Sequence, residues 1–306
     1  VLMDKSFSSS SYFLKKGIFE ESQGAVIFPG EKYGLHTRVF INKMGLPTYE
    51  AKDLALIQIK SERVPYDKSV IVTANEVNDY FDVVLKAASL VEPEMADKTV
   101  HIGHGMLRLK NGKMSSRTGQ VVTGESLIGD VSAEIKKKME ATEKTKEIKN
   151  IDEVVTWVAI GAIKYSMLKQ SPGKDIAFDF ETALSFEGDS GPYLQYAYAR
   201  AMSVLEKGNI KEIGFVRTQS LHNSEESLMK WLGRFGEIVE TAKNNLAPNL
   251  ICSYLIELSS RFNLFYNQCK IVGTKEEEFR LSLTKAVTQV LKNGLWLLGI
   301  ETVEKM

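Results

Sequence analysis

The character of the sequence changes once along the chain, at about residue 126. Before this point, short segments of β-branched and apolar residues alternate with helical patterns, which is typical of an α/β domain. One of them, the run Val-Ile-Val-Thr within residues 68–74, predicts a buried parallel strand. After residue 126, apolar residues recur at spacings of three and four, which predicts long helices. We therefore expect an α/β domain followed by an all-helical bundle.

The predicted elements are strands at 24–28, 36–41, 68–74 and 100–109 and helices at 48–60, 79–90, 130–149, 152–169, 192–207, 223–243, 249–271 and 276–298. The helix at 192–207 follows a break at residues 188–191, where Asp189 or Ser190 can cap it and Pro192 suits its first turn. We assign Trp231 and Trp296 to packing. The expected core stripe of the helix at 249–271 consists of Ile251, Leu255, Leu258, Phe262 and Phe265.

The composition, with 43% hydrophobic and 25% charged residues, is that of a globular protein. No apolar run reaches the about 18 residues that a membrane span needs, and the start does not resemble a secretory signal. The formal net charge is zero, so any RNA contact must come from local patches and aromatic stacking. Cys252 and Cys269 are too far apart along one helical pattern for a disulfide. We expect reduced thiols, as in a cytoplasmic protein, and no zinc site.

A loop with small hydroxyls and cations, Lys113-Met114-Ser115-Ser116-Arg117, follows the last predicted strand of the α/β region. Such a loop suits work on a triphosphate, because a lysine can neutralise the charge that develops as pyrophosphate leaves. Hydroxyls and backbone N–H groups can bind the phosphate oxygens. On its chemistry alone, the segment also fits a polar surface hairpin.

The loop is similar to the second signature of class I aminoacyl-tRNA synthetases, usually Lys-Met-Ser-Lys-Ser. Lys113, Met114 and Ser115 match it, whereas Ser116 replaces the second lysine and Arg117 the final serine. Arginyl enzymes are the class I members that most often depart at this place. Lys113 and Arg117 are both candidates for the cation that meets the pyrophosphate.

Three further stretches resemble the arginyl-tRNA synthetase family. Residues 38–41 with 47–55 resemble its arginine-holding segment, residues 191–200 (GPYLQYAYAR) the opening of its anticodon-binding domain, and residues 297–306 its C-terminus. The resemblance spans nearly the whole chain in family order.

This resemblance implies the C-terminal portion of such an enzyme, in three parts. They are half of a Rossmann-type catalytic domain at 1–128, a helical stem at 129–185 and an all-helical anticodon-binding domain at 186–306.

Residues 101–104, His-Ile-Gly-His, spell the first class I signature, but their surroundings argue against that role. The next residues are strand-like, and Lys113 follows His104 too closely for two signatures that flank ATP from opposite halves of the sheet. The true first signature lies at a helix N-terminus. We interpret residues 101–104 as strand and expect the first signature to be absent from this chain.

On the predicted helix at 48–60, Tyr49 and Asp53 are one turn apart and share a face. The resemblance places both against arginine, whose guanidinium the carboxylate would take through paired charge-assisted hydrogen bonds. Without the resemblance, Asp53 would be interpreted as solvent-facing. Val77 stands about where several relatives have a glutamine, so Asn75 or Glu76 is expected to make that contact.

The resemblance also implies roles around ATP. Catalysis is assigned to Lys113, Ser115, Ser116 and Arg117, and ATP binding to Gly105, Met106, Lys113 and Met114.

Tyr193, Tyr196 and Arg200 form one helical face with two rings and a cation. Sequence-specific RNA recognition favours single-stranded bases stacked on such side chains, and an anticodon loop provides them. The resemblance adds Tyr266 and Met306 to this site. Ordinary core packing is the alternative for each tyrosine.

The resemblance implies an arginine–tRNA ligase, which forms arginyl-adenylate from arginine and ATP and transfers the arginyl group to tRNA. The expected cofactors are ATP and Mg²⁺ on its phosphates, with no protein metal site. The expected partners are L-arginine and tRNA(Arg), and we expect a monomer without membrane contact. One alternative is a tRNA-binding module without catalysis. Another is a class I lysyl-tRNA synthetase, against which residues 191–200 and the terminal Met306 argue.

Overall fold

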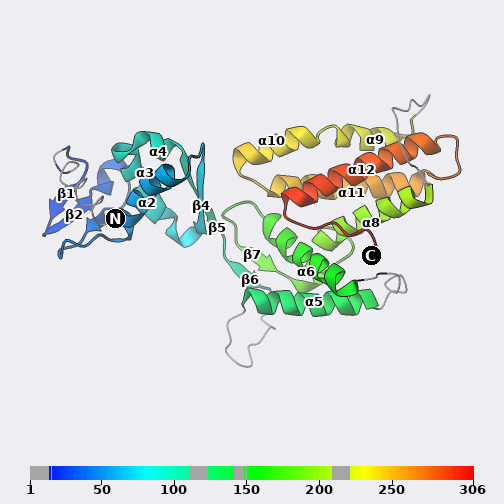
Figure 1. The fold of residues 1–306 in the computed structure, drawn as a ribbon, viewed down its shortest axis with the longest axis horizontal. Helices are drawn as coiled ribbons and strands as arrows, with labels where there is room; N and C mark the ends of the chain where they lie inside the picture. Colours follow the sequence, from blue (N-terminus) through cyan, green and yellow to red (C-terminus); the bar gives the residue numbers. More distant parts are fainter. Residues whose placement is uncertain (1–13, 15, 111–122, 141–147, 149, 209–220) are drawn as a thin grey trace. The chain divides into compact units, whose positions relative to one another are not determined.

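The structure, a computed structural model, describes residues 14, 16–110, 123–140, 148, 150–208 and 221–306 (Figure 1). The chain divides into two compact units. We call residues 1–106 with 172–174 the α/β unit, and residues 107–171 with 175–306 the helical unit.

The α/β unit begins with an antiparallel sheet of β1 (Glu20–Ser22), β2 (Ala25–Phe28) and β3 (Arg38–Ile41), in that order. Gln23 and Gly24 join β1 to β2, and both have positive φ, as a two-residue hairpin turn requires. A short 3-10 helix, η1 (Gly30–Tyr33), connects β2 to β3. Phe28 and Phe40 pack with Phe19 and with residues of two helices to form the core of this unit.

A parallel β-α-β arrangement follows. Helix α2 (Tyr49–Arg63) leads to β4 (Ser69–Ala74), which pairs in parallel with β5 (Thr99–His104). Between the strands come η2 (Asn75–Val77), α3 (Asn78–Val91) and α4 (Pro93–Asp97). The parallel pairing confirms the sequence prediction for residues 68–74.

The prediction that this strand is buried is wrong. Val70 and Val72 of β4 are 42% and 62% exposed. A strand is buried on both faces only where other elements cover both. Within the described part of the chain, β4 and β5 form a two-stranded sheet, and the valine side of β4 stays open.

The helical unit opens with a layer that the sequence predicted only in part. Strand β6 (Leu107–Leu109) pairs in parallel with β7 (Ile176–Phe178), so the predicted strand at 100–109 is two strands, and β7 was not expected. Helices α5 (Gly124–Glu140) and α6 (Ile151–Leu168) pack against each other, and α7 (Phe180–Ala183) follows β7. Val131, Ile135, Val158 and Phe178 belong to their common core.

The bundle proper contains α8 (Gly191–Gly208), α9 (Asn223–Leu232), α10 (Phe235–Asn245), α11 (Asn249–Gln268) and α12 (Glu277–Leu297). The helix predicted at 223–243 is two helices, divided at Gly233 and Arg234. The Ser190 hydroxyl caps α8 by accepting a hydrogen bond from the Tyr193 backbone N–H at 3.2 Å. The predicted stripe of α11 is confirmed as core, since Ile251, Leu255, Leu258, Phe262 and Phe265 are all buried.

The two tryptophans differ in position. Trp231 stacks on Tyr254 at 5.5 Å between ring centroids, so the packing assigned to it is confirmed. For Trp296 the assignment is wrong, because its side chain is 75% exposed. The core face of α12 passes through Leu291 and Leu295, and the next position turns about 100° away from that face. Cys252 and Cys269 are buried free thiols, as predicted.

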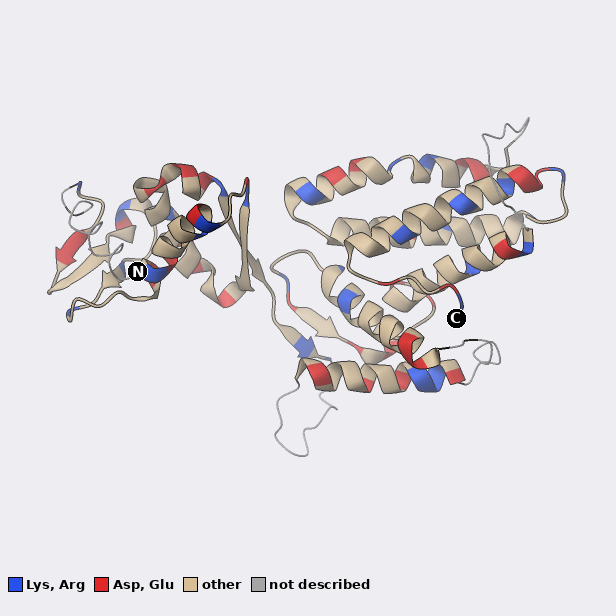
Figure 2. Ribbon diagram, in the orientation of Figure 1, with Lys and Arg blue, Asp and Glu red and all other residues tan. Residues whose placement is uncertain are grey.

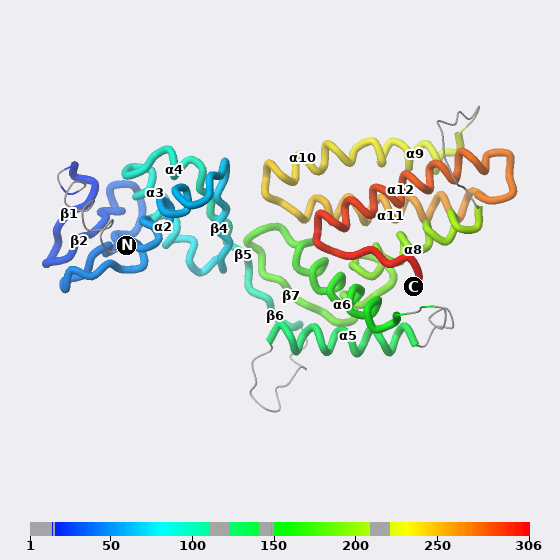
Figure 3. The backbone as a smooth tube through the Cα atoms, in the orientation of Figure 1, coloured from blue at the N-terminus to red at the C-terminus, as the bar shows by residue number. Residues whose placement is uncertain are grey.

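The segment after α12 runs back across the helical unit (Figure 3). Ile300 belongs to the bundle core, whereas Val303 belongs to the α5–α6 core. The buried Gln195 of α8 holds the segment by donating a hydrogen bond to the Glu301 carbonyl at 2.8 Å. This path brings the last residues of the chain beside α8.

Acidic and basic residues are interspersed along the helices of the bundle (Figure 2), in keeping with a formal net charge of zero. Among the described helices, none combines the length and the apolar character that crossing a membrane requires.

Candidate functional site

A surface pocket of about 880 Å³ lies in the helical unit, where α8, the end of α11 and the last residues of the chain meet. Its lining includes Tyr196, Arg200, Tyr266 and Met306. These are four of the five residues that the sequence analysis assigned to an RNA site, and they come from three distant segments. The structure therefore brings most of the predicted group together, although it does not test their role.

Arg200 holds two of the rings together. Its guanidinium carbon lies 4.7 Å from the centroid of the Tyr196 ring and 5.5 Å from that of Tyr266. One guanidinium nitrogen donates to the Tyr196 hydroxyl at 3.0 Å. Tyr266 is 40% exposed, so its ring is not buried in the core as the packing alternative would require. The arrangement offers a cation between two aromatic rings at the rim of a pocket.

Tyr193 has a different environment. It packs against the bundle core and is not among the lining residues of the pocket. Its hydroxyl accepts a hydrogen bond from the Asn263 side-chain amide at 2.9 Å. The same Asn263 accepts a hydrogen bond from Arg200 at 2.6 Å through its carbonyl oxygen. Tyr193 is therefore linked to the pocket through Asn263 and Arg200. Its ring packs against the bundle core, as the packing alternative expects.

Sequence reasoning missed Asn263, because a single asparagine between Phe262 and Leu264 gives no functional signal. It also missed three lysines that line the pocket, Lys207, Lys270 and Lys305. They come from the end of α8, the turn after α11 and the C-terminal segment, so no local pattern groups them. With Arg200 they outnumber the one acidic lining residue, Glu206, which makes the pocket locally basic. A basic groove beside stacking rings suits a nucleic-acid strand.

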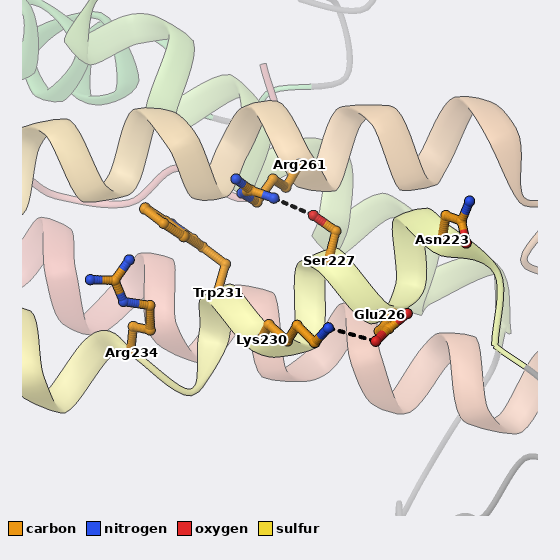
Figure 4. A pocket seen from close by; sticks show the side chains of 7 residues that line it. All are labelled: Asn223, Glu226, Ser227, Lys230, Trp231, Arg234 and Arg261. Atoms are coloured by element: carbon orange, nitrogen blue, oxygen red, sulfur yellow. Dashed lines mark hydrogen bonds and ion pairs between the residues drawn. The ribbon is translucent and has the colours of Figure 1, made fainter.

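A second pocket, of about 440 Å³, lies between α9 and α11 (Figure 4). Its cations already have acidic partners. Lys230 pairs with Glu226 and Arg261 with Glu257, each at 2.6 Å, and Arg234 pairs with Glu237 at 3.6 Å. The guanidinium groups of Arg234 and Arg261 also lie 5.1 and 4.8 Å from the Trp231 ring. Because these charges are satisfied within the protein, this pocket suits an anionic ligand less well.

In the α/β unit, the candidate arginine-binding residues lie on α2 as the sequence predicts. Tyr49 and Asp53 are one turn apart, and Tyr49 is 78% exposed at the start of the helix. The Asp53 carboxylate accepts a hydrogen bond from the Tyr80 hydroxyl at 2.5 Å. The role of both residues in binding arginine stays a prediction.

The other predicted residues of this unit lie where its two parallel strands end. Ala74 and His104 are partners in the register, so the segments that follow them, Asn75–Glu76 and Gly105–Met106, leave the same edge of the sheet. Ligands of α/β proteins bind beyond this carboxyl edge. The Asn75 side chain donates to the Gly173 carbonyl at 3.3 Å, and Glu76 is exposed.

Residues 101–104 form the last part of β5, which confirms the strand interpretation of the His-Ile-Gly-His sequence. His101 stacks on Phe81 at 4.2 Å, and its Nε2 lies 2.7 Å from the Thr73 hydroxyl. Burial lowers the pKa of His101. Gly103 lies so close to Asn78 that an added Cβ would approach the Asn78 Oδ1 to 2.1 Å. Packing within the β-α-β arrangement accounts for His101 and Gly103 of this tetrapeptide.

The predicted phosphate loop, Lys113, Met114, Ser115, Ser116 and Arg117, lies outside the described residues. Its roles in catalysis and ATP binding stay predictions. Within the ranges that the structure describes, no group of three or more His, Cys, Asp or Glu side chains is placed to hold a metal ion.

Comparison with known families gives two matches along the chain. Residues 5–180 match the family described as tRNA synthetases class I (R), catalytic domain. Residues 194–306 match the DALR anticodon binding domain. The second match contains all four predicted residues that line the larger pocket.

Individual proteins agree with the family matches. The chain is 36% identical over 298 residues to an arginine–tRNA ligase of Clostridium beijerinckii, and 37% identical over 297 residues to that of Clostridium acetobutylicum. Each alignment covers 95% of this chain and 52% of the relative. The chain thus spans about half the length of the curated relatives it matches.

Among solved structures, the arginyl-tRNA synthetase of Thermus thermophilus is similar with a TM-score of 0.86 and 27% identity. That match covers 100% of this chain and 58% of the other. The arginyl-tRNA synthetase of Plasmodium falciparum has a TM-score of 0.81 at 22% identity, covering 97% of this chain and 52% of the other, and supports the fold alone.

Proposed function

Because the chain belongs to the class I arginyl-tRNA synthetases, we propose that it supplies part of the catalytic site and the anticodon site of an arginine–tRNA ligase. The complete protein would form arginyl-adenylate from arginine and ATP and would then transfer the arginyl group to tRNA(Arg). The chain matches about half the length of its curated relatives, so the complete activity would draw on further residues of a longer protein.

The observation that carries this proposal is the larger pocket of the helical unit. Its rings and guanidinium can stack on unpaired bases, while its lysines can contact phosphates. Anticodon bases are unpaired and are therefore available for such stacking. Tyr196, Arg200, Tyr266 and Met306 would line the base site, and Tyr193 would support it through Asn263.

In the α/β unit, Asp53 would take the guanidinium of the arginine substrate, beside Tyr49 and with Asn75 or Glu76 near the edge of the sheet. Gly105, Met106, Lys113 and Met114 would contact ATP. Lys113 or Arg117 would neutralise the charge that develops on the leaving pyrophosphate, and Ser115 and Ser116 would bind its oxygens. Catalysis would consist of positioning and charge stabilisation, without a covalent enzyme intermediate.

Mg²⁺ would reach the site on the phosphates of ATP, whose oxygens are the ligands this ion prefers. The described residues supply no ligand cluster of their own for it.

The first test is binding of this chain to an arginine-accepting tRNA and to a non-arginine tRNA of equal length, over a range of salt concentrations. We expect a preference for the arginine tRNA and an affinity that falls as salt rises, because phosphate contacts release counterions. Lys270→Ala, in the larger pocket, should reduce the salt dependence by about one phosphate contact. The matched control is Arg234→Ala in the second pocket, which should leave it unchanged. Equal binding of both tRNAs would contradict the proposed anticodon site.

A tRNA-binding module without catalysis is the second candidate, since the pocket lies wholly within the helical unit. Arginine-dependent pyrophosphate exchange by the complete protein separates the two. Exchange would support the ligase, whereas selective tRNA binding without exchange would support the binding module.

A further inference from the structure

Helix α2 carries two acidic residues that face different partners, Glu50 and Asp53, and Arg38 of β3 pairs with Glu50. The Arg38 guanidinium lies 3.3 Å from the Glu50 carboxylate, and both side chains are largely buried. The salt bridges found among the described residues do not include Asp53. Arg38 therefore neutralises Glu50, and the negative charge of Asp53 remains for another cation.

The described partner of Asp53 is a neutral group. The hydroxyl of Tyr80, on α3, donates a hydrogen bond to Oδ2 of Asp53 at 2.5 Å. A hydroxyl donor satisfies one carboxylate oxygen without cancelling its charge, which a lysine or arginine would do.

The Tyr80 ring is itself held from two sides. The Arg38 guanidinium lies 5.3 Å from its centroid, and Phe81 meets it edge to face at 5.1 Å. Burial, followed by the hydrogen bond to Asp53, raises the pKa of Tyr80 well above its usual range. The hydroxyl therefore remains a donor throughout the physiological pH range.

We infer that Tyr80 is a positioning residue for substrate recognition. Its hydroxyl binds Oδ2 of Asp53 and fixes the carboxylate, whose remaining acceptor positions receive the guanidinium of the arginine substrate. This inference rests on the proposed arginine site and names a residue that acts through Asp53. The expectation of paired hydrogen bonds to the guanidinium remains compatible with this contact, because each carboxylate oxygen can accept about two hydrogen bonds.

The test uses the complete protein and measures arginine-dependent pyrophosphate exchange with saturating ATP and tRNA. Tyr80→Phe removes the hydroxyl and keeps the ring against Arg38 and Phe81. We expect the KM for arginine to rise about tenfold, in the range for a lost hydrogen bond to a charged group, while kcat changes less than about threefold. In an Asp53→Asn background, the same change should have less than about a twofold effect, since the two residues act as one unit.

Tyr66→Phe is the matched control, because its hydroxyl contacts α2 elsewhere, at the Ile57 carbonyl. It should leave the KM for arginine unchanged. Thermal melting of each variant reports on folding separately. A merely structural role for Tyr80 would lower the melting temperature and would act equally in the wild-type and Asp53→Asn backgrounds.

The outcomes distinguish the inference from the proposed function. If Asp53→Asn leaves the KM for arginine unchanged, the proposed arginine site is wrong. If Asp53→Asn raises that KM but Tyr80→Phe does not, or if the Tyr80→Phe effect persists in the Asp53→Asn background, the positioning role is overturned and the arginine site stands.

Discussion

In the helical unit, Tyr196, Arg200, Tyr266 and Met306 surround one pocket that rests on a continuous core. In the α/β unit, the candidate residues are divided between α2 and one edge of a two-stranded sheet, in which Val70 and Val72 are open to solvent. A pocket with walls from two helices and the C-terminal segment needs no further element to take shape. A site at the edge of a two-stranded sheet has few neighbouring elements that could form its opposite wall. The proposed recognition of tRNA therefore depends less on further residues than the proposed activation of arginine does.

An assay of the chain alone tests this difference between the two units most directly. Residues 1–306 should show no arginine-dependent pyrophosphate exchange, even with tRNA present, because the first class I signature is expected to lie outside them. The same preparation should bind tRNA(Arg). Exchange and tRNA binding are measured on one sample, so that a folded pocket serves as the control for an inactive catalytic part. Measurable exchange from the purified chain would contradict the predicted absence of the signature.

Within the complete protein, Lys113→Ala should have the next largest effect. A cation that acts on charge developing at the leaving phosphates stabilises mainly the transition state. We expect the turnover of activation to fall about 10²- to 10³-fold, as for the loss of one preorganised charge-stabilising donor. The KM for arginine should change little. An unchanged turnover with a raised KM for arginine would place Lys113 elsewhere, and Arg117→Ala would then identify the cation.

The contrast between the units also explains which features were predictable from sequence. Long helices such as α11 and α12 were predicted because the spacing of their apolar residues is a local property. Residues 101–104 were correctly interpreted as strand from their immediate neighbours.

Features that depend on distant partners were missed. Strand β7 is only three residues long and exists by pairing with β6, which lies far away in the sequence. The exposure of Val72 depends on whether another element covers it, which no local pattern states. The same holds for the candidate sites. Tyr196 and Tyr266 were named from the family resemblance, whereas Asn263 and Tyr80 could be identified only from their contacts with residues of other helices.

If the pocket rings stack on bases, Tyr196→Ala and Tyr266→Ala should each weaken binding of tRNA(Arg) by about 1–3 kcal/mol. Tyr→Phe at either position should cost much less, because the ring remains. The measurements are tRNA affinity and thermal melting on the same variants.

Rings that serve packing would behave differently from rings that stack on bases. Their loss would lower the melting temperature and weaken the binding of every RNA equally. A large shift in melting temperature without a change in preference between arginine and non-arginine tRNA would show that both tyrosines serve packing.

Asn263→Ala should have a smaller effect on the same pocket. The variant removes the carbonyl that accepts from Arg200 and the amide that donates to the Tyr193 hydroxyl. Arg200 keeps its contacts with the Tyr196 and Tyr266 rings, so we expect only about a three- to tenfold loss of tRNA affinity, the range of one ordinary intramolecular hydrogen bond. Asn267→Ala, on the neighbouring rim, is the control. Equal losses of tRNA affinity for both variants would show that the contacts of Asn263 with Arg200 and Tyr193 do not support binding.

The smallest expected effect is a dependence of stability on pH that belongs to the α/β unit alone. Burial lowers the pKa of His101 below its usual 6.5, so the unfolded state binds more protons than the folded state as pH falls through that region. The stability contributed by neutral His101 is therefore fully present above pH 6.5 and is lost progressively below it. In the helical unit, burial raises the pKa of Cys252 to about 12, so this thiol stays neutral over the same range and adds no such dependence.

His101→Phe keeps a ring against Phe81 and removes the titration, at the cost of the contact with Thr73. We expect the decrease in urea midpoint between pH 7.5 and pH 5 to become smaller in the α/β unit and to stay the same in the helical unit. Hydrogen exchange resolved by segment assigns each transition to its unit. The matched control is His104→Phe, the same substitution at an exposed position at the end of the same strand. An equal change from both substitutions, or a change that extends to the helical unit, would show that the partly buried ring of His101 is not the source.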